Sequence, residues 1–503
     1  MEEQQKEKIF RCAGLRKEAF CELPAGITIY LSLALIIMMG LFFTLLESAR
    51  VYGLEAHSRM ESELLLESEM AEYHPLLFDK YHLYLLSANT NGKLDIASVE
   101  KDMWKLGNEN LTGRGTVNKN TADFYEMQLG ACSIESYTLV TDKEGAAYRQ
   151  QAAEYMKNVI PLSVLYDLYE NATQTEENAQ DIDAKIERAD GEVQNIENGN
   201  GSSLSKEGMM GREAETDDID ISPELMAEAE KTKNPLEEVR ELKNKGILSL
   251  VINDVSKISE LTIDGEDAIA ERECCQGDGR VSLDISDMEE GLFFREYLLQ
   301  EFGSYREPSE GTALQYAQEY FIAGKNSDID NLTAVTERLL GIREVVNYIR
   351  IHKDTKRTAL AKAMALTIGG ASLNPALIAI IKEGILAAWA FTDSIEDVKT
   401  LLAGGKVPVF EGKKEWSLSY EDYLRILMYL TGEESLALRS LNYMEKDIRL
   451  AEGDKNFRMD CMISGMHISC EYLAEPLFFG LFGSGGGWDG SYSFRTDQKF
   501  SYE

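Results

Sequence analysis

One uncharged stretch, residues 23–46, constrains this chain more than any other feature of its sequence. Apart from three hydroxyls and a tyrosine it carries only apolar side chains and backbone. A helix needs roughly 20 apolar residues to cross the hydrocarbon core of a bilayer. The alternative is a cleaved signal peptide, whose apolar region usually has about 7–15 residues and precedes a small-residue cleavage site. Because this run is longer and bulky and charged residues surround Ser48 and Ala49, we expect a retained anchor.

The charges beside the stretch indicate its orientation. Five basic residues precede it: Lys6, Lys8, Arg11, Arg16 and Lys17. The other side carries Arg50 and Arg59 among many glutamates. Lysine and arginine near a membrane helix favour the cytoplasmic side. We therefore expect a single-pass protein of the cell membrane, with a cytoplasmic N-terminus and the bulk of the chain extracellular.

The helical pattern continues beyond the membrane segment. Strong helix formers extend from residue 47 to residue 73, with only Gly53 interrupting, and Pro75 ends the run. One helix over residues 27–73 spans roughly 70 Å. The expected organisation is a cytoplasmic tail (1–22), a transmembrane helix (23–46), a helical stalk (47–75), a first part of the outer domain (76–170), a disordered acidic insertion (171–223) and a second part (224–503).

The periodicities of the outer domain predict an α+β fold that is mostly helical, with some antiparallel strands. Helices are expected over residues 76–87, 146–168, 236–245, 289–305, 311–323, 331–351, 356–367, 376–392, 394–402, 419–430 and 434–450. Strands are expected over residues 132–140, 457–472 and 491–502, with a glycine-rich turn at residues 483–490. Residues 171–223 are too polar to offset the entropy of ordering them, so we expect disorder there.

A second uncharged run, residues 363–381, is also long enough to span a membrane. It contains Asn374-Pro375, a pair that marks the start of a helix rather than its interior. We favour two buried helices joined by a turn, with a second membrane span as the alternative.

The composition of the chain limits the classes of partner and site that it can have. The chain has 51 basic and 87 acidic residues, which argues against nucleic-acid binding. Seven cysteines are present, and the five after the membrane segment are an odd number, so they cannot all pair within the chain. Cys461 and Cys470 could pair across a hairpin, whereas the adjacent Cys274 and Cys275 are expected to be free or variable. There is no CxxC spacing to support a zinc site.

The sequence contains only weak signals for catalytic or metal-binding residues. The five histidines lie in neither an HExxH motif nor a Gly-x-Ser-x-Gly elbow. Residues 326–337 resemble a calcium-binding loop, but Asn331 replaces the turn glycine. We prefer Asp330 or Asn331 as the cap of a helix beginning at Leu332. No catalytic, cofactor-binding or metal-binding residue is therefore assigned, no cofactor is expected, and the chain is not expected to be an enzyme.

Two resemblances bear on function. The layout of leader, apolar helix and amphipathic extension resembles type IV pilin-like proteins, although the glutamate that follows a pilin cleavage site is missing after Gly26. The chain also resembles a family of unknown function from Gram-positive anaerobes, encoded beside tight-adherence (Flp-type) pilus genes. The residues that carry this resemblance are 26–33, 46–50, 246–252, 319–324, 387–398, 401–408 and 420–425.

The resemblance implies a structural or accessory component of a tight-adherence pilus or secretion apparatus. Its implied partners are membrane lipid and other membrane proteins of that apparatus, and no nucleic acid. Alternatives are a surface protein that binds a ligand or cation and an anchored extracellular hydrolase. The second requires a convergent Ser/Cys–His–Asp or metal cluster.

Overall fold

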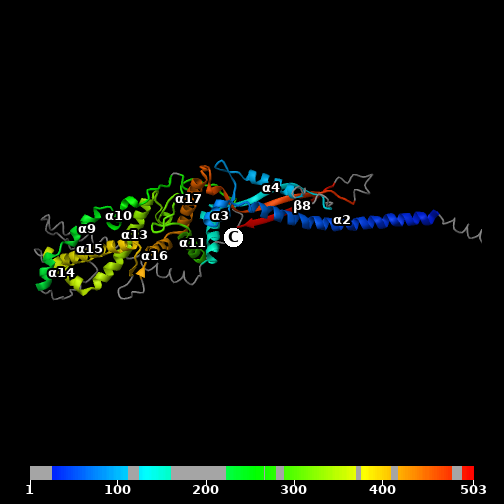
Figure 1. Cartoon of the computed structure of the whole chain (residues 1–503). Helices are drawn as coiled ribbons and strands as arrows, with labels where there is room; N and C mark the ends of the chain where they lie inside the picture. Colours follow the sequence, from blue (N-terminus) through cyan, green and yellow to red (C-terminus); the bar gives the residue numbers. More distant parts are fainter. Residues whose placement is uncertain are drawn as a thin grey trace, which may run out of the picture. The chain divides into compact units, whose positions relative to one another are not determined.

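The computed structural model describes residues 25–111, 124–159, 223–265, 267–278, 288–369, 375–408, 417–478 and 490–502 (Figure 1). They are mostly helical with some antiparallel strands, which confirms the expected α+β fold. The chain divides into two compact units. The first unit comprises residues 1–72, 95–137 and 465–501, and the second comprises 73–94, 138–464 and 502–503. The expected tail (1–22), residues 171–222 of the insertion and residues 483–489 of the glycine-rich turn lie outside the described residues.

The first unit is built on one long helix, α2 (Ala25–Met70), drawn in blue in Figure 1. This confirms the predicted continuous helix, whose length at 1.5 Å per residue is about 70 Å. Gly53 does not interrupt it. A side chain at this position would come within 2.7 Å of the Tyr125 ring, so the glycine allows Tyr125 to approach the helix. The second half of α2 packs against β8 (Tyr492–Ser501) and α4 (Ile96–Leu111), a helix that the sequence did not predict.

The strands of the first unit are β4 (Met127–Leu139), β7 (Met462–Ala474) and β8. They confirm the strands predicted at residues 132–140 and 491–502. β7 lies beside β4 and pairs antiparallel with β8, from Gly465 opposite Ser501 to Ala474 opposite Tyr492. The prediction of a strand over residues 457–472 was wrong at its start. A short helix, η4 (Met459–Cys461), precedes β7.

The second unit contains most of the helices around one large apolar core. These helices are α3 (Pro75–Tyr81), α5 (Asp142–Lys157), α8 (Pro223–Lys231), α9 (Pro235–Lys243), α10 (Ile247–Val251), η3 (Val255–Lys257), α11 (Met288–Glu301), α12 (Ala317–Ala323), α13 (Asp328–Lys353), α14 (Thr355–Gly369), α15 (Pro375–Leu402), α16 (Tyr420–Leu430) and α17 (Glu433–Glu452). Short strands β1 (Leu86–Ser87), β2 (Asn89–Thr90), β3 (Lys93–Leu94), β5 (Val407–Pro408) and β6 (Ser417–Leu418) complete it. α13, α14 and α15 pack against one another, and α11 packs against α5.

Several predicted boundaries need correction. The helix predicted over residues 76–87 ends at Tyr81, because His82 takes a left-handed conformation and the chain then enters β1. Residues 376–402 form one helix, α15, and not two. The hydroxyls of Thr392 and Ser394 do not break it, since they donate to the carbonyls of Ala388 and Ala390 within the helix.

The second apolar run forms parts of α14 and α15, with residues 370–374 outside the described part of the chain. The prediction that a helix starts at the Asn-Pro pair is confirmed by α15, which begins at Pro375. α2 and α15 are the two described helices that are long and apolar enough to cross a membrane. Ile381, Ile385 and Leu386 of α15 are fully buried against the core of the second unit, which favours a core helix over a span.

A buried arginine ties the helices of this core together. Arg343 of α13 donates to the Asp397 carboxylate of α15 at 2.7 and 3.0 Å and to the Tyr423 hydroxyl of α16 at 3.1 Å. Asn347, one turn further along α13, donates to the same carboxylate at 2.7 Å. A buried charge is tolerated only when it is paired and hydrogen-bonded in this way.

Candidate functional site

The first half of α2 presents a long apolar surface that the other described parts of the first unit leave mostly open, apart from Phe478, whose ring stacks on Phe43 near its end. Twelve of its large apolar side chains are 40–67% exposed: Ile27, Ile29, Leu31, Leu33, Leu35, Ile36, Ile37, Met38, Met39, Leu41, Phe42 and Leu45. Soluble monomers rarely expose contiguous apolar surface on this scale. Residues 27–46 extend about 30 Å along the helix axis, which equals the thickness of a bilayer core.

This exposed surface ends at a buried ion pair. Glu47 and Arg50 are only 1% exposed, and Arg50 donates to Glu47 at 3.1 Å. Arg50 also donates to the carbonyls of Phe124 (3.0 Å), Tyr125 (2.5 Å) and Glu475 (2.8 Å). The second Glu47 oxygen accepts from the backbone N–H of Phe478 at 2.8 Å. The pair therefore fixes two loops against α2 where its apolar surface stops.

Sequence reasoning used Glu47 and Arg50 only as charges flanking the membrane segment. It did not predict that both side chains are buried. The available signal was their three-residue spacing directly after the uncharged run, because residues three apart on a helix are neighbours.

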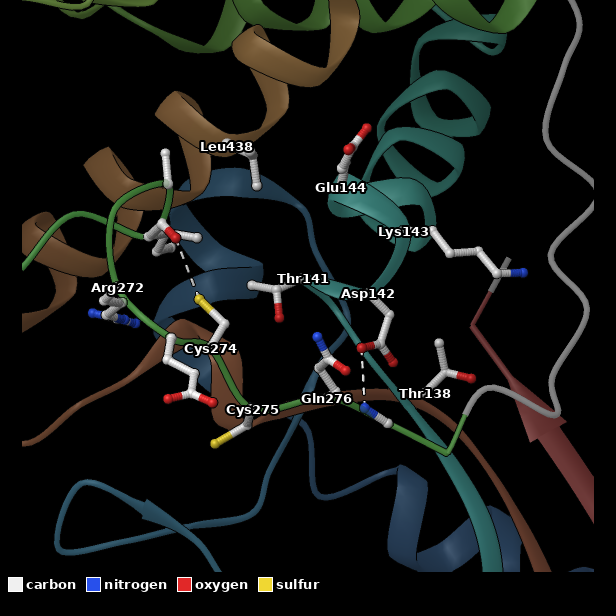
Figure 2. Close-up of a pocket in the computed structure, with 14 residues that line it drawn as sticks. Thr138, Thr141, Asp142, Lys143, Glu144, Arg272, Cys274, Cys275, Gln276 and Leu438 are labelled. Atoms are coloured by element: carbon white, nitrogen blue, oxygen red, sulfur yellow. Dashed lines mark hydrogen bonds between the residues drawn. The ribbon is translucent and has the colours of Figure 1, made fainter.

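The second unit contains a pocket of about 560 Å³ (Figure 2). Its walls come from the start of α5, from the segment 269–277 and from α17. The lining residues are Thr138, Thr141, Asp142, Lys143, Glu144, Ile269, Ala270, Arg272, Glu273, Cys274, Cys275, Gln276, Gly277 and Leu438. Two hydroxyl oxygens, of Thr138 and Thr141, are buried and have no hydrogen-bond partner among the described residues.

A left-handed turn shapes one wall of the pocket. Lys143, Glu144 and Gly145 all have positive φ, at 49°, 59° and 79°. Non-glycine residues rarely adopt this conformation, and such residues persist only where the surrounding structure holds them. The adjacent Asp142 carboxylate does so by accepting from the N–H of Leu139 at 2.8 Å and of Gly277 at 3.0 Å, the second bond being drawn in Figure 2.

A cluster of paired charges holds the opposite wall. Arg272 donates to Glu445 at 2.6 and 2.7 Å and to Asp460 at 2.6 Å. Arg449 and Lys446 of α17 donate to Asp267 at 2.6 and 3.1 Å. Burial opposes the charge of Asp267, but these two hydrogen bonds outweigh it and hold its pKa well below the ordinary value. The cluster ties the segment 267–275 to α17, and its carboxylates are already engaged by cations.

The two thiols of the pocket, Cys274 and Cys275, have no histidine beside them among the lining residues. The Cys274 thiol donates to the Ile269 carbonyl at 3.3 Å, and burial raises its pKa. The Cys275 sulfur points away from that of Cys274 (Figure 2). None of the five histidines, all of which are described, lines the pocket. Carboxylates pair with four of them: His57, His74, His82 and His352. The arrangement can hold a small polar ligand, but it brings together no thiol–imidazole pair.

The calcium-like loop is a helix start. The preferred caps, Asp330 and Asn331, were wrong. Ser327 caps α13 by accepting from the Asp330 N–H, while Asn331 bonds to the backbone of Lys325. Asp328 accepts from the N–H groups of Gln315 and Tyr316. Within the described residues no group of three or more His, Cys, Asp or Glu side chains is arranged to hold a metal ion.

The disulfide considered between Cys461 and Cys470 was also wrong, because one strand and not a hairpin joins them. Cys461 ends η4 and Cys470 lies within β7. Nine residues of extended chain span about 30 Å, whereas a disulfide joins Cα atoms about 4.4–6.8 Å apart.

A comparison with protein families finds one match in this region. The model of a family of unknown function (DUF5702) matches residues 226–419 and 417–474. This part of the chain is therefore similar to a family of unknown function, as the sequence indicated. The match includes the pocket residues from Ile269 onward and excludes α2. No curated protein and no solved structure matches the chain.

Proposed function

We propose that this chain is a single-pass membrane protein whose role is structural and not catalytic. α2 crosses the membrane with residues 27–46, the N-terminus lies in the cytoplasm, and both folded units lie outside. The observation that carries the proposal is the exposed apolar half of α2, which stops at the buried Glu47–Arg50 pair. An apolar helix surface about 30 Å long is stable when lipid covers it.

The proposed role is that of a component or accessory protein of a tight-adherence-type pilus or secretion apparatus. Support comes from the resemblance at residues 26–33 and 46–50, which contribute to the exposed surface and the buried pair. Small residues let membrane helices approach closely. Ala34 and Gly40 lie on the exposed half of α2, and a side chain added at Gly40 meets nothing within 4 Å. This leaves room for a neighbouring membrane helix.

Two measurements test these two halves of the proposal. Sequencing the N-terminus of membrane-extracted protein separates an anchor, which retains residues 27–46, from a signal peptide, which loses them. A start at Met1 indicates a permanent anchor and a start at Ile27 indicates pilin-type processing. Detergent extraction from a host carrying the pilus genes, followed by affinity purification, should then enrich pilus membrane proteins. Their absence argues against the pilus role while leaving the anchor intact.

A second candidate function is binding of a small polar ligand in the pocket of the second unit. The two buried and unpartnered threonine hydroxyls favour it, since buried polar groups normally have a partner. A ligand screen by thermal shift should find compounds that stabilise the wild type and stabilise Thr141→Val less. A calcium titration without any change in stability argues against the cation-binding form of this alternative.

A further inference from the structure

Two cysteines that are 338 residues apart in the sequence meet in the first unit. Cys132 lies on β4 and Cys470 on the neighbouring strand β7. Their sulfur atoms are 2.8 Å apart, and both are free thiols in this structure. A disulfide S–S bond is about 2.05 Å long. Bond formation therefore needs only a small movement of two side chains that already face each other.

We propose that Cys132 and Cys470 are the site of a disulfide bond in the exported protein. The proposal rests on the extracellular orientation proposed above, since exported domains meet thiol oxidants whereas the cytoplasm keeps thiols reduced. The bond closes the sheet of the first unit covalently by joining β4 to β7.

The oxidant is a disulfide, either a small molecule or a thiol–disulfide exchange protein. Cys132 is half-buried and Cys470 fully buried, so Cys132 is the more accessible thiol. The thiolate of one cysteine attacks the oxidant, forms a mixed disulfide and releases one thiol. The thiolate of the other cysteine then attacks the sulfur of the first and releases the second thiol. Two S–H bonds of the chain are lost and one S–S bond forms, while the S–S bond of the oxidant becomes two S–H bonds.

The remaining described cysteines have other neighbours. Cys461 interacts with Cys275, and burial together with Asp460 raises the pKa of the Cys461 thiol to about 12. Cys274 donates to a backbone carbonyl. Cys274 therefore serves as a matched control, because it is a half-buried thiol with no sulfur partner at hydrogen-bonding distance among the described residues.

The first test maps the thiols of the full chain after export. Membranes are solubilised with an excess of N-ethylmaleimide, digested without reduction and examined by mass spectrometry. We expect one cross-linked peptide pair that contains Cys132 and Cys470, lacks two hydrogens and separates on reduction. Maleimide on both cysteines, or a link from either one to another cysteine, overturns the proposal.

The second test separates the pairing from the orientation. Purified, reduced protein is treated with oxidised glutathione, and the wild type is compared with Cys274→Ser and Cys132→Ser. We expect the link in the wild type and Cys274→Ser, where dithiothreitol then lowers the melting temperature, and no such shift in Cys132→Ser. Absence of the link here overturns the disulfide. A link that forms here but not in cells overturns the extracellular orientation and so the disulfide of the exported protein.

Discussion

Single residues set where the exposed apolar half of α2 gives way to a folded unit. Arg50 neutralises Glu47 and satisfies three backbone carbonyls, so its removal leaves a buried carboxylate without its cation. Breaking a buried pair from one side costs about 3–5 kcal/mol. We expect Arg50→Ala to lower the free energy of unfolding of the first unit by this amount, measured by urea unfolding in detergent.

The control for this prediction lies nine residues further along α2. Arg59 pairs with Glu55 at 2.7 Å, but the two side chains are 67% and 49% exposed. Exposed pairs of this kind contribute about 0.5 kcal/mol or less. Arg59→Ala should therefore leave the unfolding curve almost unchanged. Equal losses in the two variants contradict the role assigned to the Glu47–Arg50 pair.

A buried carboxyl makes the second unit sensitive to pH. Glu319 is fully buried, and one oxygen accepts from the Tyr420 hydroxyl at 2.6 Å and the Tyr305 N–H at 2.8 Å. Burial raises its pKa to about 7 from an ordinary value of 4.5. The folded state therefore holds a proton that the unfolded chain releases near pH 4.5. The contribution of the protonated Glu319 to the free energy of unfolding is fully present below pH 4.5. It is lost as the pH rises through about 7, and this loss lowers the free energy of unfolding by about 3 kcal/mol.

Glu319→Gln tests this pH dependence because the amide is neutral and its oxygen accepts the same two hydrogen bonds. We expect the variant to be more stable than the wild type at pH 8 and similar to it at pH 4.5, as measured by urea unfolding at both pH values. The control is Glu396→Gln, which removes the negative charge of an exposed side chain on α15 instead of a buried one. A pH profile that Glu319→Gln leaves unaltered contradicts the prediction.

At the scale of elements, the left-handed turn at the start of α5 depends on a glycine. Gly145 has φ +79°, and a Cβ there would lie 3.2 Å from side chains of Ala437 and Leu441 in α17. Alanine in this conformation costs about 1–2 kcal/mol before the crowding is counted. We expect Gly145→Ala to lower the melting temperature of the protein and to loosen the contact between α5 and α17.

Gly341 in α13 provides a glycine control of opposite sign. It lies in regular helix, and an added Cβ meets nothing within 4 Å. Alanine is more favourable than glycine in a helix interior by about 1 kcal/mol. Gly341→Ala should therefore raise the melting temperature. If the melting temperature falls in both variants, the effects do not come from the backbone conformation at each glycine, which contradicts the prediction.

The sequence predicted those elements whose ends carry local signals. Ser419 and Asp422 form a capping box at the start of α16, and Pro375 opens α15, so both helices lie close to where they were expected. Left-handed Gly404 follows the end of α15, where a glycine commonly stops a helix. The cap of α13 was assigned to the wrong residue, because polar side chains that cap a helix, bond to the backbone or bind metal look alike until their partners are known.

Features that depend on distant parts of the chain could not be predicted in this way. No local pattern predicts that Cys132 lies beside Cys470, because the contact is set by which strands are neighbours and not by spacing along the chain. The burial of Arg50 depends on residues 124–125 and 475 closing around it, yet locally it is one charge in a glutamate-rich helix. The pocket likewise joins three separate segments.

At the scale of the whole molecule, the exposed apolar half of α2 is a surface that the described part of the first unit leaves largely open. Its surface is apolar around the whole helix and not along one stripe, since exposed side chains follow one another at positions 35–39. A helix that is hydrophobic all round is buried in protein or lipid. Lipid covers every side of such a helix, whereas one protein surface covers a single stripe.

Charge placed in the middle of this segment tests the membrane assignment. Ile36 and Met39 lie near its centre and are 62% and 40% exposed. An arginine at the centre of a membrane helix costs about 2.5–3.5 kcal/mol. We expect the double variant Ile36→Arg, Met39→Arg to lose membrane integration, measured as the fraction that stays in the pellet after an alkaline wash.

The control is Met60→Arg, Leu64→Arg on the second half of the same helix, where the replaced side chains are 58% and 47% exposed. Because this half faces water in the proposed orientation, the control should remain in the membrane. Loss of both variants from the pellet, or retention of both, contradicts a membrane segment that ends at Glu47.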